Sequence, residues 1–102
     1  MSIVRSRNGV PVRLAEERWL HIIRRHPEMA EQRDRDLETL AAPEMIQGDL
    51  GELLAIRSYA ETPLTSKFLV VAYREAGAAD GFIFTSYLSS RPLARRRIIR
   101  RQ

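Results

Sequence analysis

Two neighbouring segments decide the fold of this chain, KFLVVAYRE (67–75) and GFIFTSYL (81–88). Both are rich in β-branched and aromatic residues, and the loop between them carries Gly77 and the turn-forming pair Asp80-Gly81. A third segment of the same kind, Glu52–Tyr59, precedes them across a loop that contains Thr62-Pro63. Consecutive strands with short connections pair antiparallel. We therefore expect a three-stranded meander, with Met45-Ile46 as the candidate for a short fourth strand.

Before the meander the apolar residues follow a helical period. The spacing predicts a first helix over Ala15–His26, with Trp19, Ile22 and His26 on its apolar stripe. Proline at position 27 ends this helix, and the pattern predicts a second one over Glu28–Ala41. The charge-rich middle of the second helix is expected to face solvent.

Turn chemistry and element order complete the fold prediction. Asn8-Gly9 indicates a hairpin turn, and Pro11 limits the second arm of that hairpin to an edge strand or a short extended entry. Helices followed by a meander predict an α+β fold, with the N-terminal helices packed on a three- to four-stranded antiparallel sheet. We expect one domain over residues 1–92 and an arginine-rich C-terminal tail over residues 93–102.

Composition excludes several classes of protein. The 102 residues are 44% hydrophobic and 29% charged, which is typical of a single globular domain. The absence of cysteine excludes disulfides, thiolate zinc sites, iron–sulfur clusters and cysteine nucleophiles. No apolar run approaches the roughly 20 residues that span a bilayer, and the first residues carry charges. We therefore expect a cytoplasmic protein that does not enter a membrane.

The net charge of +4 is concentrated at one end of the chain. Residues 91–102 contain six arginines and no acid, so that residues 1–90 carry a net charge of −2. The body alone therefore does not show the basic balance of a nucleic-acid-binding protein. The tail, with Arg95, Arg96 and Arg97, is either an RNA-binding element or a solvated end.

The alternation of strand residues predicts two faces of the sheet. One consistent arrangement places Leu54, Ile56, Phe68, Val70, Phe82 and Phe84 against the helices. The opposite face then gathers Arg57, Tyr59, Tyr73, Thr85 and Tyr87. This face is either an ordinary solvent-facing sheet surface or a platform on which tyrosines stack RNA bases and arginine holds a phosphate.

His26 is the main candidate for chemistry. It ends the apolar stripe of the first helix, where it is either a core-edge histidine with one hydrogen bond or a general acid or base. His21 is expected on the polar side of the same helix. The two histidines are five residues apart and no carboxylate cluster accompanies them, so we expect neither a metal site nor a cofactor. Cleavage of RNA through its own 2′-hydroxyl requires neither a metal ion nor a cofactor, so this reaction remains a candidate.

Several short motifs carry a family resemblance. The segments ERWLHIIRRHPEM (17–29), PEMI (43–46), KFLVVAYRE (67–75) and DGFIFTSYLSSRP (80–92) resemble the PBECR-type domains. These belong to the barnase–EndoU–colicin–RelE-like ribonuclease superfamily of phage, mobile elements and toxins. The resemblance covers residues 12–92 and implies one or two helices on a four-stranded antiparallel sheet. It also implies RNA binding on the open sheet face and metal-independent catalysis.

The resemblance implies roles for four residues. His26 of the RHPE match would be the general base or acid, Thr85 and Tyr87 would position or protonate the phosphate, and Arg91 would hold phosphate charge. We therefore expect a small endoribonuclease with RNA as its substrate and an inhibitory protein, an antitoxin or immunity protein, as a partner. Two alternatives stay open, since the same fold also hosts binding proteins. They are a non-catalytic nucleic-acid-binding module and a protein-interaction subunit that pairs through a sheet edge.

Overall fold

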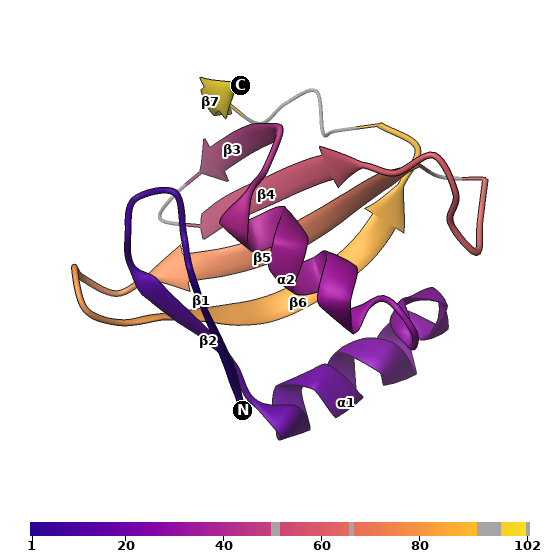
Figure 1. The fold of residues 1–102 in the computed structure, drawn as a ribbon, viewed down its shortest axis with the longest axis horizontal. Helices are drawn as coiled ribbons and strands as arrows, with labels where there is room; N and C mark the ends of the chain where they lie inside the picture. Colours follow the sequence, from indigo (N-terminus) through magenta and orange to yellow (C-terminus); the bar gives the residue numbers. More distant parts are fainter. Residues whose placement is uncertain (50–51, 66, 92–96, 102) are drawn as a thin grey trace.

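The computed structural model describes residues 1–49, 52–65, 67–91 and 97–101 (Figure 1). Its strands are β1 (Ser2–Arg5), β2 (Pro11–Leu14), β3 (Met45–Asp49), β4 (Glu52–Ser58), β5 (Phe68–Glu75), β6 (Gly81–Ser89) and β7 (Arg97–Arg101). They form one mixed sheet in the order β1-β2-β6-β5-β4-β3-β7. The α+β class is confirmed. The sheet is wider than the three or four strands predicted, and it is not purely antiparallel.

The predicted meander is present at the centre of this sheet. Strands β4, β5 and β6 pair antiparallel in sequence, and their bounds lie within one residue of the predicted segments. The candidate strand at Met45-Ile46 is β3, which pairs antiparallel with β4. Strand β7 pairs antiparallel with β3, so that part of the arginine-rich tail belongs to the sheet.

The N-terminal hairpin forms as its turn residues predict. Gly9 adopts a φ of +79°, which is accessible to glycine without strain, and β1 pairs antiparallel with β2. Of the two alternatives for the second arm of this hairpin, the edge strand is wrong, because the short strand β2 also pairs with β6 in parallel. Pro11 is tolerated since it is the first residue of β2, and the parallel pairing involves only Val12 and Arg13.

The first helix, α1 (Glu16–Arg25), closely follows the prediction. Acidic residues in its first turn and basic residues in its last favour the helix dipole, and its stripe buries Trp19 and Ile22. Strand β2 pairs only with the start of β6, at Gly81 and Phe82. The helix α1 lies beside the remaining part of β6 and contacts it (Figure 1).

The second predicted helix is two elements. A 3₁₀ turn, η1 (Pro27–Met29), is followed by the helix α2 (Arg33–Ala41), which packs on β4 and β5. The expectation that the charged middle of this segment faces solvent fails at one residue. Asp36 is fully buried, together with Thr39 and Leu40 on the same side of α2.

The helices cover the face of the sheet that was predicted to be free of them. The main core joins Trp19, Ile22 and Leu40 to one set of strand residues, namely Ala55, Leu69, Val71, Tyr73, Ile83 and Leu88. A second apolar cluster lies on the outer face, away from α2, and consists of Leu54, Ile56, Val70 and Ala72 with Met45, Phe68, Phe84 and Tyr87 at its margin. The residues of β4 and β5 that were predicted to share a face do share one. The face predicted to meet the helices is, however, the one that points away from them. Alternate residues of both strands are apolar on both sides, so alternation alone does not identify the helix side.

A β-bulge changes the parity within β6. Ala72 faces Thr85 and Tyr73 faces Ile83, which leaves Phe84 without an opposite residue. Phe84 and Thr85 therefore both lie on the outer side, while Ile83 and Ser86 face the helices. The predicted division of β6, with Phe84 and Thr85 on opposite faces, is wrong for this reason.

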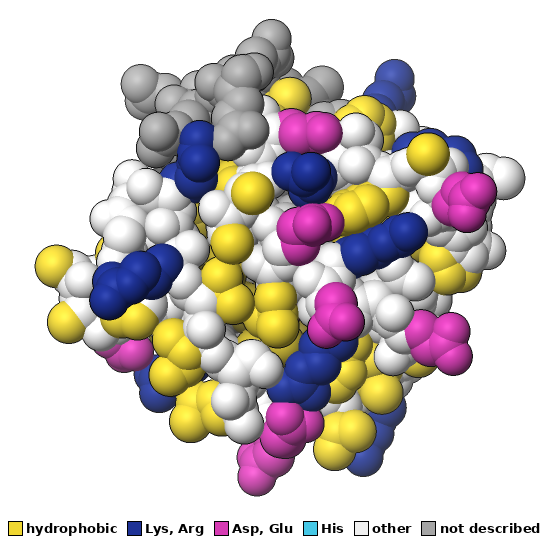
Figure 2. All heavy atoms as spheres, viewed as in Figure 1, with side chains coloured by type: hydrophobic (Ala, Val, Ile, Leu, Met, Phe, Trp, Pro, Cys, Tyr) yellow, Lys and Arg dark blue, Asp and Glu magenta, His cyan; other side chains and the backbone are white. Residues whose placement is uncertain are grey.

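Figure 2 shows the helix-covered side of the molecule. Basic and acidic side chains are interspersed over this face, and no histidine is visible on it. Within the described residues no helix combines the length and apolar character needed to cross a membrane.

Candidate active site

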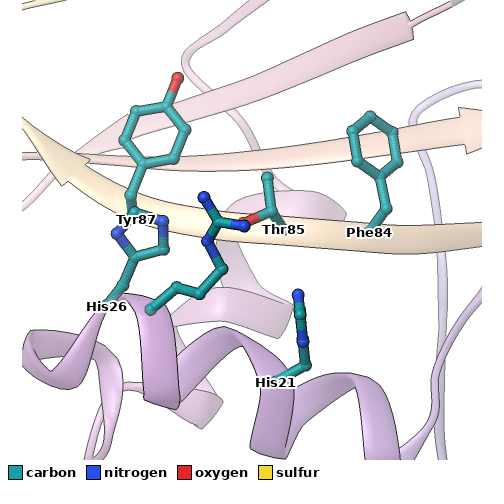
Figure 3. Close-up of a pocket in the computed structure, with 6 residues that line it drawn as sticks. His21, His26, Phe84, Thr85 and Tyr87 are labelled. Atoms are coloured by element: carbon teal, nitrogen blue, oxygen red, sulfur yellow. The ribbon is translucent and has the colours of Figure 1, made fainter.

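An open pocket lies between the second half of α1 and the bulged part of β6 (Figure 3). Its volume is about 410 Å³, which falls within the range of small-ligand sites. The residues that line it are His21, Arg25, His26, Phe84, Thr85 and Tyr87. Three of them, His26, Thr85 and Tyr87, are among the four residues expected to be catalytic.

The end of α1 positions His26. Its backbone N–H donates to the Ile22 carbonyl at 2.7 Å, and it then leaves the helical conformation because Pro27 follows. The imidazole is 32% exposed, so it is neither a core side chain nor a free surface group. Figure 3 shows the side chains of His21 and His26 pointing from α1 towards β6.

The His26 imidazole lies between an acid and an aromatic ring. Its Nδ1 is 3.7 Å from Oε2 of Glu28, a carboxylate in η1 that is only 17% exposed. The centroid of the imidazole is 5.7 Å from that of the Tyr87 ring, at an interplanar angle of 36°. A carboxylate at Nδ1 favours the tautomer with its proton on that nitrogen, which leaves Nε2 for proton transfer.

Two arginines and a histidine follow α1 along or beside the pocket. Arg25 and His21 lie one helical turn apart and both line it, and the exposed Arg18 lies one turn before His21. The guanidinium of Arg18 is within 3.5 Å of the Phe84 carbonyl oxygen, to which it donates a hydrogen bond. This side of the pocket therefore presents cations and hydrogen-bond donors, the groups that bind phosphate.

The opposite wall comes from β6. Tyr87 and Thr85 pair with Val70 and Ala72 across the sheet, on the outer face. The bulge adds Phe84 to the same side, so that one short segment supplies a phenol, a hydroxyl and an apolar ring.

The other predicted sheet residues lie on the far side of the sheet from Thr85 and Tyr87. Tyr73 is 1% exposed and belongs to the main core, so its predicted contact with RNA is wrong. Arg57 donates to the Ala42 carbonyl at 2.7 Å, and its Nε is 3.8 Å from Oε1 of Glu38. The predicted common polar face, with Arg57 and Tyr59 beside Thr85 and Tyr87, is therefore wrong.

Tyr59 is held by the same carboxylate. Its hydroxyl donates to Glu38 at 2.6 Å, and the Arg35 guanidinium lies 4.6 Å from its ring centroid. Burial raises the pKa of Tyr59 to about 12, and the hydrogen bond to Glu38 acts in the same direction. These contacts attach the end of β4 to α2 and leave no role for Tyr59 at the pocket.

Of the predicted arginines at the end of the chain, the two that the structure describes, Arg91 and Arg97, lie away from this site. Arg91 follows β6 in a turn closed by the Ser89 hydroxyl and does not line the pocket. Arg95 and Arg96 lie outside the described residues. Arg97 begins β7, which three strands separate from β6.

Four residues of the site were not assigned to it by the sequence analysis. Glu28 stands in the RHPE motif two residues after His26, and this spacing was the available signal. Arg25 is the last residue of α1 and His21 lies one turn before it, on the side that was expected to face solvent. Phe84 has no local signal, because the bulge that exposes it contains no glycine.

Comparison with family models, curated proteins and solved structures finds no match to this chain. Among the residues that the structure describes, no group of three histidine, aspartate or glutamate side chains converges to hold a metal ion. The assignment of a function therefore depends on the geometry of the pocket.

Proposed function

We propose that the pocket binds an RNA phosphodiester and that the protein is a metal-independent endoribonuclease. The observation that carries the proposal is the His26 imidazole, which lines a pocket together with Arg25 and has Glu28 at its Nδ1 and Tyr87 beside its ring. General acid–base groups next to cations are what transfer through the RNA 2′-hydroxyl requires.

The proposed reaction uses His26 as the base. Nε2 takes the proton of the 2′-hydroxyl, the 2′-oxygen attacks phosphorus, and the bond from phosphorus to the 5′-oxygen breaks. The products are a 2′,3′-cyclic phosphate and a 5′-hydroxyl. Figure 3 shows the phenolic oxygen of Tyr87 at the end of its ring remote from His26. In-line displacement needs the base and the acid on opposite sides of the phosphate, so Tyr87 is the proposed proton donor to the 5′-oxygen.

The remaining pocket residues bind and orient the phosphate. Arg25 neutralises the charge that develops on the non-bridging oxygens, and Thr85 donates a hydrogen bond to one of them. Glu28 acts as a positioning residue because it reaches the substrate only through the His26 imidazole.

The test is RNA cleavage in excess EDTA. His26→Ala is expected to lower the rate about 10²- to 10⁴-fold, the usual contribution of general acid–base catalysis. Arg25→Ala is expected to lower it about 10²- to 10³-fold, as for one donor to a developing oxyanion. Arg24→Ala is the matched control, since Arg24 is also exposed in the last turn of α1 but does not line the pocket.

The products distinguish this reaction from other nuclease chemistry. A single 2′-deoxy substitution at the cleaved nucleotide must abolish cleavage there, and the 3′ ends must be cyclic phosphates. An active His26→Ala protein, or intact RNA with a folded wild-type protein, contradicts the proposal. Binding of RNA without cleavage supports the alternative of a non-catalytic module.

A further inference from the structure

We infer that Phe84 is a stacking platform for a nucleobase next to the scissile phosphate, and that the substrate is single-stranded RNA. This inference rests on the proposed function and adds to it a residue that selects the substrate class. It starts from the β-bulge, which leaves Phe84 without an opposite residue on β5.

The Phe84 ring lies at the margin of an apolar cluster and is not enclosed by it. It packs against the outer cluster that contains Val70 and Ala72. The ring remains partly exposed, whereas its neighbour Ile83 on the other face is 2% exposed. Phe68 and Phe82 are partly exposed in the same way, so exposure alone does not mark Phe84. What distinguishes Phe84 from the other two phenylalanines is that it lines the same pocket as His26.

The neighbours of this ring suit a nucleotide. The Phe82 ring lies 6.4 Å from that of Phe84, centroid to centroid, and is tilted by 57°. The guanidinium of Arg74, an exposed residue of β5, lies 6.0 Å from the Phe84 centroid. Aromatic rings with arginine beside them bind single-stranded nucleic acid, because the ring stacks on the base and the cation contacts ring or phosphate.

The geometry selects single-stranded RNA over duplex. A base can stack on Phe84 only when one of its own faces is free, and bases inside a duplex are covered on both faces. Phe84 and His26 also line the same pocket, whose volume is about 410 Å³. A base on Phe84 and a phosphate at His26 would therefore belong to adjoining nucleotides of one RNA strand.

The experiment measures binding of a short RNA with a 2′-deoxy nucleotide at the cleavage position, which prevents turnover. The companion probe is the same oligonucleotide with an abasic site beside that position, which keeps the phosphate charge. Wild-type protein is expected to bind the intact probe about 5- to 150-fold more tightly than the abasic one, the range for one stacked base.

The variants separate stacking from stability. Phe84→Leu is expected to remove the preference for the intact probe, and Phe84→Trp to restore it. Phe68→Leu is the matched control, because Phe68 is also a partly buried phenylalanine of the outer cluster but lies away from the pocket. It is expected to keep the preference.

The outcomes for the two proposals differ. Equal binding of the two probes by the wild-type protein, or an unchanged preference in Phe84→Leu, overturns the stacking platform while RNA cleavage stands. Absence of both RNA binding and RNA cleavage in the folded wild-type protein overturns the proposed function, and the platform with it.

Discussion

Replacing Asp36 by asparagine tests the most unusual feature of the core. Asp36 projects from α2 towards β6 and is fully buried. Burial raises the pKa of its carboxyl from the usual 3.8 to about 7, while the Ser86 hydroxyl and the Arg33 guanidinium act in the opposite direction. Ser86 moderates this pKa, although neither its hydroxyl nor the carboxyl oxygens form a hydrogen bond of ordinary geometry.

The magnitude follows from linkage between protonation and folding. Below pH 4 the carboxyl is protonated in both the folded and the unfolded chain, so it contributes no difference. Between pH 4 and 7 the unfolded chain releases the proton and the folded chain retains it, so the free energy of unfolding falls as the pH rises. A pKa moved from 3.8 to about 7 corresponds to a fall of about 4 kcal/mol. Above pH 7 the loss is complete and constant.

The assay is urea unfolding of wild type and Asp36→Asn from pH 4 to pH 8, followed by the fluorescence of the buried Trp19. Asparagine does not titrate, so the stability of the wild type relative to the variant is expected to fall by about 4 kcal/mol across this range. Asp34→Asn, an exposed residue of the same helix, is expected to leave the pH dependence almost unchanged. The reasoning is refuted if the difference between wild type and Asp36→Asn does not depend on pH, or if it grows as the pH rises.

Three further substitutions test the packing of the fold, each by urea unfolding. A methyl group at Gly81 would lie 2.8 Å from the Arg74 carbonyl oxygen, so Gly81→Ala is expected to cost about 1–3 kcal/mol; an unchanged midpoint contradicts this. Leu40→Ala leaves a cavity between α2 and the sheet and is expected to cost about 2–5 kcal/mol, and a smaller loss means that the core closes around it. Tyr59→Phe removes the hydrogen bond to Glu38 and is expected to cost about 1 kcal/mol, which equal stability would disprove.

The sequence predicted the elements that local chemistry determines. Pro27 and the apolar stripe placed the end of α1, and Asn8-Gly9 placed the first turn. The central strands were predicted almost to the residue, because β-branched and aromatic runs between turn residues leave few alternatives.

The faces of the sheet could not be predicted in the same way. Val70 and Val71 are adjacent, equally apolar and almost equally buried, one on each side of β5. Only the packing of α2 decides which of them meets the helices, and that depends on contacts distant in sequence. The buried position of Asp36 was hidden for a similar reason, since charged residues flank it on α2.

The candidate site was predicted in part. His26, Thr85 and Tyr87 share one pocket, as the motifs implied. The prediction placed Thr85 and Tyr87 on the same face as Arg57 and Tyr73, because it assumed strict alternation along all of β6. The β-bulge breaks this alternation, and it contains no glycine that would have indicated it in the sequence. The same bulge that made the prediction fail adds Phe84 to the pocket.

The short parallel pairing between β2 and β6 has a consequence for synthesis of the chain. It joins Val12 to Gly81, and the neighbouring pocket joins His26 to Tyr87. On the ribosome the hairpin and α1 emerge long before these partners exist, whereas β4 and β5 pair with sequence neighbours. Long-range pairing of this kind forms late and slowly. The nascent chain therefore lacks the complete pocket until β6 has left the ribosome, because one wall of the pocket comes from β6.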